Sequence, residues 1–378
     1  MYNYISLEQA ADILDSYRKP VNSKERLNLI KGKPLDELFP YYGATGQVGW
    51  IDSFLTDGEY ILLGEDGAPF LNPYAEKAYI IHGKTWVNNH AHILHSKTNN
   101  EFLCYYLNYF NYKKYVSGTT RLKLTQAQMR KIPIPNIPSD EQSRIVARIE
   151  ELFSELDKAV DTLKTTKEQL EVYRQAVLKD AFSNIAEYIP FGKITSSRLG
   201  KMLDKQKNVG VPCKYLRNIN VRWFSFDLSD LLDMKIEEKE FEKYTICKND
   251  LVICEGGEPG RCAVWEKDET IFYQKALHRV RFTIKAEPRF YMYYLWYITQ
   301  SGSINKFYTG TGIKHLTGQS LEKIPVPVTD IGEQKRLLEL IEMHLSVCDN
   351  IEKTVDAALA QADAMRQSIL KQAFEGKI

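Results

Sequence analysis

The chain contains a long internal repeat. Residues 117–182 align without a gap with residues 309–374, and about 23 of the roughly 66 aligned positions are identical. Each copy contains nearly the same short phrase, KIPIP at 131–135 and KIPVP at 323–327. The sequence therefore predicts two tandem halves with a boundary near residue 185.

Each half changes character after this phrase. In residues 1–138 and 185–328, short β-rich runs, Gly and Pro punctuation and one aromatic helix predict two compact α+β domains. Residues 139–184 and 329–378 instead carry apolar or small residues at heptad spacing, which predicts two long helices of the coiled-coil type. The positions expected to face the other helix are Ile145, Ile149, Leu152, Leu156, Ala159, Leu163, Leu170, Tyr173 and Val177 in the first helix, and Leu337, Ile341, Cys348, Ile351, Val355, Ala358, Ala362, Met365 and Ile369 in the second.

We expect the two helices to pack on each other. A helix of about 43 residues rises about 64 Å, which is typical of a coiled coil. Because a globular domain separates them in sequence, the simplest closed arrangement is an antiparallel, pseudo-twofold pair that acts as a spacer. Ser139 and Gln142 predict a capping box where the first helix begins, and His344 is expected to be a satisfied core residue. The predicted fold class is α+β, with two tandem α/β domains joined by two long helices that form an antiparallel coiled coil.

Composition limits the class of protein. With 44% hydrophobic and 26% charged residues in 378, the chain is predicted to form ordinary globular domains. No stretch approaches the roughly 18 apolar residues of a membrane span and the N-terminus lacks a signal peptide's apolar core, so we expect a cytoplasmic protein without membrane contact. Six cysteines without a CxxC pair predict reduced thiols and no zinc site.

Several motifs occur in a characteristic order. They are YYGATG at 41–46, DGEYILLGEDGAP at 57–69, SGTTRLKLT at 117–125, YLRNINVRW at 215–223 and EGGEPG at 255–260. Glu and Gln also follow each KIPxP phrase. Together with the duplication, these motifs make the whole chain resemble the specificity subunits of type I restriction-modification enzymes, the HsdS family.

The resemblance implies a division of labour. In that family two target recognition domains each read one half of a split double-stranded DNA sequence, and the helices set the spacing and dock two modification subunits. Adenine methylation with S-adenosylmethionine, and ATP- and Mg-dependent translocation and cleavage by two restriction subunits, belong to the partners, so no cofactor is expected on this chain. An alternative within the same class is the specificity subunit of a methyltransferase-only or other restriction-type complex.

Four polar segments are candidates for DNA contact. They offer hydroxyls, amides, cations and close backbone approach, which suit phosphates and base edges. Each also has a structural interpretation: a tight turn, helix capping by Thr125 and Thr317, or an Arg-Asn loop held by its own hydrogen bonds. The candidate DNA-binding residues are Tyr41, Tyr42, Gly43, Ala44, Thr45, Gly46, Thr119, Thr120, Arg121, Lys123, Arg217, Asn218, Asn220, Thr311 and Lys314.

The histidines do not predict a metal site. His90, His92 and His95 could pass for ligands, but no acidic or thiolate residue lies at a useful spacing and the second half lacks the set. We expect a core or DNA-facing strand instead.

Two other function classes remain open. Asn72-Pro73-Tyr74 resembles the Asn/Asp-Pro-Pro-Tyr motif of adenine methyltransferases, which would suggest a self-contained enzyme. One proline of the motif is missing, and the chain contains neither a glycine-rich loop in a βαβ unit nor a P-loop, so no catalytic residue is assigned. A coiled-coil scaffold that binds only proteins would explain the helices but not the duplicated polar loops.

Overall fold

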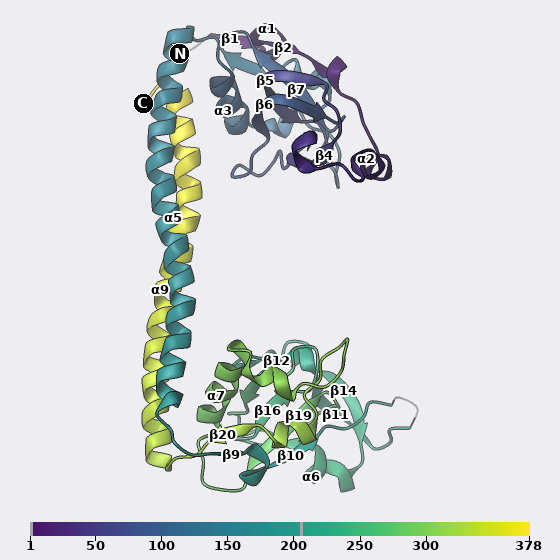
Figure 1. Cartoon of the computed structure of the whole chain (residues 1–378), viewed down its shortest axis with the longest axis vertical. Helices are drawn as coiled ribbons and strands as arrows, with labels where there is room; N and C mark the ends of the chain where they lie inside the picture. The colour runs from purple at the N-terminus through teal and green to yellow at the C-terminus, as the bar shows by residue number, and fades with distance from the viewer. Residues whose placement is uncertain (1–2, 205–206) are drawn as a thin grey trace. The chain divides into compact units, whose positions relative to one another are not determined.

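The computed structural model describes residues 3–204 and 207–378 and contains two compact units (Figure 1). Unit 1 comprises residues 1–164 and 355–378, and unit 2 comprises residues 165–354. Each unit combines one α+β domain with parts of both long helices, which confirms the predicted fold class. None of the described helices is long and apolar enough to cross a membrane.

The first domain is built on a six-stranded sheet in the order β2-β7-β5-β6-β3-β4, antiparallel except for the β3/β6 pair. Its side chains pack against the aromatic helix α3 to form the core of unit 1. The elements are β1 (Tyr4–Ser6), α1 (Leu7–Ala10), β2 (Ala11–Ile13), the 3₁₀ helix η1 (Asp15–Tyr17), α2 (Ser23–Ile30), η2 (Leu35–Glu37), β3 (Phe39–Gly43), β4 (Gly46–Ile51), β5 (Thr56–Gly64), β6 (Ala78–Val87), β7 (Ala91–Ser96), α3 (Asn100–Tyr109), η3 (Tyr112–Lys114), α4 (Gln126–Met129) and β8 (Pro133–Pro135).

The second domain contains two four-stranded sheets, in the orders β10-β19-β16-β17 and β14-β11-β18-β15. The aromatic helix α7 packs against the first of them in the core of unit 2. The elements are β9 (Tyr188–Pro190), η4 (Phe191–Lys193), β10 (Thr195–Leu199), β11 (Val211–Leu216), η5 (Asn218–Asn220), β12 (Val221–Arg222), β13 (Ser225–Phe226), β14 (Leu232–Ile236), η6 (Glu238–Glu240), α6 (Phe241–Tyr244), β15 (Thr245–Ile246), β16 (Leu251–Cys254), β17 (Cys262–Val264), β18 (Ile271–Tyr273), β19 (Leu277–Phe282), α7 (Pro288–Gln300), η7 (Ser303–Phe307), α8 (Gly318–Glu322) and β20 (Pro325–Pro327).

The repeated KIPxP phrase forms the last strand of each domain. In unit 1, β8 pairs with β1 and places Ile134 opposite Ile5. In unit 2, β20 pairs with β9 and places Val326 opposite Ile189. Each pair is only two strands wide, so the prolines that flank the central residue disrupt no wider hydrogen-bond ladder. The phrase therefore closes each domain immediately before its long helix begins.

The two long helices are α5 (Ser139–Ser183) and α9 (Ile331–Phe374). In unit 1 the beginning of α5 packs with the end of α9, and in unit 2 the end of α5 packs with the beginning of α9. Within each unit the two helices are therefore antiparallel, as the sequence predicts.

The heptad assignment needs four corrections. Tyr173, Ile351 and Met365 were expected in the interface between the helices, but they are 45%, 40% and 46% exposed. Ala159 was also expected there and is exposed. Beside Tyr173, the side chain of Arg174 is buried. An arginine with acidic partners therefore occupies the interface between the helices in place of an apolar residue. An apolar heptad pattern cannot predict such a charged position. His344 is half-buried, and its Nδ1 lies 2.9 Å from the Tyr173 hydroxyl.

The predicted capping box at Ser139 and Gln142 is wrong. Ser139 is already the first helical residue, and the Gln142 side chain donates to Ile137 O at 2.8 Å. Gln334 makes the equivalent bond to Thr329 O at 2.9 Å. Both glutamines are buried, so the repeated Glu-Gln pair fixes each helix to the segment that precedes it.

Each aromatic helix also binds the end of a long helix. In unit 1 the Phe374 ring lies 5.4, 5.1 and 5.4 Å from the rings of Phe102, Tyr106 and Tyr109 of α3. In unit 2, Phe182 makes the matching contacts at 5.4, 5.2 and 5.8 Å with α7 residues Phe290, Tyr294 and Tyr297. The core of each unit therefore contains a phenylalanine from the far end of a helix.

Candidate nucleic-acid interface

Two equivalent loops, residues 117–123 and 309–315, are the most exposed part of the predicted site. Ser117 and Lys123 exchange backbone hydrogen bonds of 3.0 and 2.8 Å, and Thr309 and His315 exchange bonds of 2.8 and 2.9 Å. Each exchange closes a narrow loop that presents its intervening side chains to solvent. We call them loop 1 (117–123) and loop 2 (309–315).

A second backbone contact fixes each loop to the sheet. Leu124 N donates to Glu65 O at 2.7 Å in unit 1, and Leu316 N donates to Glu255 O at 2.7 Å in unit 2. Glu65 and Glu255 are therefore structurally equivalent, although the surrounding sequences differ. This equivalence also pairs Asp66 with Gly256.

Glycine is required at the second position of both loops. Gly118 has φ +99°, and a Cβ there would lie 2.4 Å from Arg121 O. Gly310 has φ +93°, and a Cβ there would lie 2.3 Å from Ile313 O. Any larger residue would therefore open the loop.

The two loops carry different side chains on this common frame. In loop 1, Thr119 and Thr120 are exposed, Arg121 Nη2 donates to Asp66 Oδ1 at 2.8 Å, and Lys123 Nζ lies 3.2 Å from Glu65 Oε1. In loop 2, Thr311 and Lys314 are exposed, and Ile313 is 73% exposed. The Lys314 ammonium lies 5.8 Å from the centre of the Tyr308 ring. The structure thus brings each predicted loop set together at one surface.

A buried charged network supports loop 1. His92 is fully buried, and its Nε2 lies 3.0 Å from the carbonyl oxygen of Leu124, directly after loop 1, while its Nδ1 lies 2.7 Å from Asp15 Oδ2. Arg18 donates to Glu65 Oε2 at 2.5 Å and lies 3.0 Å from Asp15 Oδ2. The network connects η1, strand β7, the turn after β5 and the segment that follows loop 1.

The network also stabilises the charged form of its two acids. Burial raises the pKa of the Asp15 carboxyl, but hydrogen bonds from His92, Gln126 and Ile93 outweigh burial, so the net pKa lies below its usual value. Burial likewise raises the pKa of Glu65, and the hydrogen bond from Arg18 reverses the effect. Both acids are therefore held as carboxylates beneath loop 1.

Loop 2 lacks this network. His278 contacts Leu316 O through Nε2 at 2.9 Å, as His92 contacts Leu124 O. The cross-strand neighbours of His278 are the apolar residues Leu199 and Ile253, and burial lowers the pKa of His278 below its usual value. A histidine thus occupies this place in both domains, but only in the first domain does a carboxylate, Asp15, lie within hydrogen-bond distance of its Nδ1.

The YYGATG segment forms the β3/β4 hairpin. Tyr41 is buried and its hydroxyl lies 3.2 Å from both N and O of Val21, and Gly43 O accepts from Tyr79 Oη at 2.5 Å. Tyr42, Ala44 and Gly46 are half-buried, while Thr45 at the tip is exposed. Of the six predicted residues, Thr45 therefore offers the most accessible side chain, and Tyr41 has a structural role.

The Arg217-Asn218-Asn220 set is turned inward. Arg217 Nη2 donates to Asp230 Oδ2 at 2.6 Å, and Asn218 Nδ2 donates to Gly256 O at 2.6 Å. Asn220 is buried and donates to Asp227 O at 2.9 Å and Asp230 O at 3.1 Å. In this conformation all three side chains hold the η5 loop in shape, which favours the structural interpretation of that motif.

The histidines and the Asn-Pro-Tyr segment have local partners. His90 Nδ1 lies 2.6 Å from Asp66 Oδ1, so His90 and His92 serve different acids. Within the described residues, no group of three or more His, Cys, Asp and Glu is arranged to hold a metal ion. Asn72 Oδ1 accepts from Tyr74 N at 2.9 Å, a turn-forming contact.

The residues that sequence reasoning missed are the acids behind loop 1. Glu65 and Asp66 lie in the GEDGAP motif, 55 or more positions before Arg121 and Lys123, the loop 1 cations that they contact. The only sequence signal was the weak repetition of that motif as EGGEPG. Contacts over such a distance depend on the sheet order, which local pattern does not specify.

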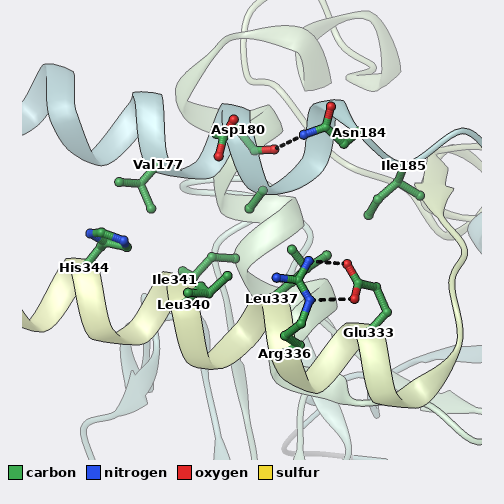
Figure 2. Close-up of a pocket in the computed structure, with 11 residues that line it drawn as sticks. Val177, Asp180, Asn184, Ile185, Glu333, Arg336, Leu337, Leu340, Ile341 and His344 are labelled. Atoms are coloured by element: carbon green, nitrogen blue, oxygen red, sulfur yellow. Dashed lines mark hydrogen bonds and ion pairs between the residues drawn. The ribbon is translucent and has the colours of Figure 1, made fainter.

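A groove of about 220 Å³ lies between the end of α5 and the beginning of α9 in unit 2 (Figure 2). Val177 and Ile341 line its interior, and Leu340 at its edge is 38% exposed. Arg336 donates to Glu333 through Nη2 and Nε at 2.6 and 2.7 Å, which lowers the pKa of that carboxylate. The groove is a helical surface with an apolar interior and a charged rim, separate in sequence from both loops.

Comparison with known proteins identifies one family. The family model "Type I restriction modification DNA specificity domain" matches residues 9–172 and 217–361. A putative type I restriction enzyme specificity subunit of Haemophilus influenzae is 26% identical over 369 residues, covering 94% of this chain and 91% of that protein. The EcoKI specificity subunit of Escherichia coli is 24% identical over 283 residues, covering 69% of this chain and 61% of that protein.

Solved structures agree in fold. A structure from work on the assembly and conformational transition of a type I restriction-modification system has a TM-score of 0.75 at 15% identity, and the match covers 100% of this chain and 98% of that chain. The HsdS subunit from Thermoanaerobacter tengcongensis has a TM-score of 0.56 at 15% identity, with 100% and 97% of the two chains covered.

Proposed function

The chain belongs to the type I restriction-modification specificity subunit family, and on that basis we propose that it reads a two-part DNA target and docks two modification subunits. The observation that carries the proposal is the duplicated loop. Loop 1 and loop 2 share one backbone frame but present different exposed side chains, Arg121 in one and Ile313 in the other. Two loops with the same backbone conformation but different exposed side chains suit the recognition of two different half-sites.

The chemistry of DNA contact follows from what the loops expose. Threonine hydroxyls, the backbone N–H groups of tight glycine turns and the cations Arg121, Lys123 and Lys314 suit phosphate oxygens and base edges. The chain does no chemistry on the DNA in this proposal. Methylation with S-adenosylmethionine belongs to the modification subunits, and ATP- and Mg-dependent cleavage belongs to two restriction subunits.

The long helices supply the other half of the proposal. We assign them as the spacer between half-sites and as the docking surface for modification subunits. The groove between α5 and α9 in unit 2 suits a protein side chain, because its apolar interior is accessible and its rim is charged. A methyltransferase-only complex would use the same surfaces without restriction subunits.

The decisive experiment is to co-express the full chain with its modification subunit in cells that lack other DNA methyltransferases. Sequencing that detects methylated bases should reveal one motif with two specified halves and an unspecified spacer. The modification subunit alone should produce no such motif, and the purified chain alone should transfer no methyl group. A motif without two separate halves, or methyl transfer by the chain alone, would overturn the proposal.

A further inference from the structure

The Arg121 guanidinium is exposed but fixed in orientation. Its Nη2 donates to Asp66 Oδ1 at 2.8 Å, while the side chain as a whole is 61% exposed. Asp66 is itself held, because the same oxygen lies 2.6 Å from His90 Nδ1, and its side chain is 22% exposed. A chain of three polar groups thus fixes one edge of the guanidinium and leaves its other N–H donors facing solvent.

Gly67 leaves room for the guanidinium on another side. Gly67 has φ +74°, and a Cβ there would lie 3.2 Å from Arg121 Nε. The absence of a side chain therefore lets the arginine lie close over this turn.

The second domain provides an internal comparison. Loop 2 has Ile313 at the position of Arg121, and Gly256 occupies the position of Asp66. The space beside Gly256 is taken by loop 2 itself, because a Cβ on Gly256 would lie 2.9 Å from His315 Nδ1. The arginine and its acid are thus both absent from the second domain, while the backbone frame is the same.

We infer that Arg121, oriented by Asp66, determines base specificity by donating to O6 and N7 of a guanine in the half-site of the first domain. A guanidinium held along one edge presents its remaining donors in a plane, which matches the two acceptors that guanine shows in the major groove. Thr119, Thr120 and Lys123 on the same loop provide phosphate contacts that set its register. This inference rests on the proposed function.

A plain phosphate contact is the competing role for Arg121. It would weaken binding to all sequences by a similar factor and leave the choice of base unchanged. A second competing role for Arg121 is a structural ion pair with Asp66, whose loss would alter thermal stability without altering the recognised sequence. The two roles predict different results in the following experiment.

The test uses the full chain assembled with its modification subunit, and duplexes that carry the target identified by methylation sequencing. Each guanine of the first half-site is replaced in turn by 7-deazaguanine, which lacks the N7 acceptor. For the natural chain, one replacement should weaken binding by about tenfold. For Arg121→Ala the same replacement should weaken binding by less than about twofold, because the partner of N7 is gone.

Asp66→Ala supplies a readout that separates orientation from charge. Removing the acid should reduce discrimination at that one guanine several-fold, while binding to unrelated DNA stays equal or becomes tighter, because a negative charge has left the surface. Arg130→Ala is the matched control, since it also removes a partly exposed arginine of the first domain that lies near an acid, 3.6 Å from Glu8, but outside loop 1 and outside the long helices. That variant should retain the full penalty for 7-deazaguanine.

Each outcome decides the inference. A penalty that persists in Arg121→Ala, a uniform loss across sequences, or a first half-site without guanine would overturn it. If Arg121→Ala lowers the melting temperature substantially, Arg121→Lys keeps the charge but not the paired donors, and retained discrimination in that variant would also overturn it. A natural chain that directs no sequence-specific methylation would instead refute the proposed function.

Discussion

Gly310 and Gly312 both lie in loop 2, but only one of them is required by the backbone. A Cβ on Gly310 would meet Ile313 O at 2.3 Å, whereas a Cβ on Gly312 would find nothing within 4 Å. Gly310→Ala should therefore open the loop at a cost of about 1–3 kcal/mol, and Gly312→Ala should be tolerated. Amide hydrogen exchange at His315, which donates to Thr309 O, should accelerate about tenfold or more in the first variant and less than about twofold in the second. Equal exchange rates in the two variants would contradict this prediction.

Asp15 should make the stability of the first domain depend on pH. Its folded pKa lies below the unfolded value of about 3.8, because hydrogen bonds from His92 and Gln126 outweigh burial. The stabilisation is therefore complete above about pH 5 and is lost as pH falls through the lower, folded pKa. Asp15→Asn should lower the free energy of unfolding by about 1–3 kcal/mol at pH 7, and the difference from the natural chain should shrink towards pH 3.

Asp12→Asn is the control for this measurement, since Asp12 is an exposed neighbour on β2. Denaturant unfolding of the full chain at several pH values should show little change for that variant. A difference for Asp15→Asn that stays constant from pH 7 to pH 3 would exclude the carboxylate as its source.

Sequence reasoning at single residues succeeded where the repeat exposed a constraint. The aligned segments SGTTRLKLT (117–125) and TGTGIKHLT (309–317) correctly indicated two equivalent polar loops, because loop 1 needs Gly118 and loop 2 needs Gly310 at the same position. It gave a less useful result for Asn220, which is a donor suited to base reading but is buried in η5. A side chain's chemical type does not reveal whether the folded chain has already used its hydrogen bonds.

Arg174 shows how the pairing of α5 with α9 in unit 2 departs from a simple heptad. Its side chain is 8% exposed and donates to Glu171 at 2.7 Å on its own helix, and to Asp349 at 2.9 Å and Glu352 at 2.7 Å on α9. The guanidinium thus contacts three acids, next to Tyr173, where the sequence predicted an apolar contact.

Arg174→Ala should therefore destabilise the helix pair more than an ordinary surface substitution. Asp349 would lose this cation and Glu352 would keep only Lys167, whose Nζ lies 3.5 Å from Glu352 Oε1, so we expect a loss of about 2 kcal/mol in the free energy of unfolding. Arg144→Ala removes an exposed ion pair with Asp140 and should change the free energy of unfolding by less than about 0.5 kcal/mol. Denaturant unfolding followed by helical circular dichroism measures both, and equal effects would show that the acids are adequately solvated without Arg174.

The helices themselves were predictable because heptad spacing and the absence of internal proline are local signals. Their antiparallel pairing followed from the duplication. The sheet orders were not predictable, because β3 joins β6 in parallel and β11 joins β18 in parallel across long stretches of sequence. Such pairings are decided by the packing of the whole domain, and that is also why the acids behind loop 1 were missed.

The chain as a whole completes each domain with a residue from far away in the sequence. Phe374 lies four residues from the C-terminus, yet it is 5% exposed in the core of the first domain, among the aromatic rings of α3. Phe182 is 1% exposed in the core of the second domain, among the rings of α7. The core of the first domain therefore includes the end of the last helix, whereas the core of the second includes Phe182 from the helix that precedes it and Leu337 and Ile341 from the beginning of the helix that follows it.

This arrangement predicts opposite effects for two chemically identical substitutions. Phe374→Ala should destabilise the first domain by about 3 kcal/mol through loss of a buried ring, and Phe182→Ala should do the same to the second. Hydrogen exchange followed by peptide mass spectrometry should show faster exchange in α3 for Phe374→Ala and in α7 for Phe182→Ala. Because each variant is the control for the other, general loss of stability is distinguished from a local effect. Faster exchange in α7 but not in α3 for Phe374→Ala would refute the assignment of the end of α9 to the core of the first domain. In that case, methylation sequencing of the same variant should show loss of the second half-site rather than of the first.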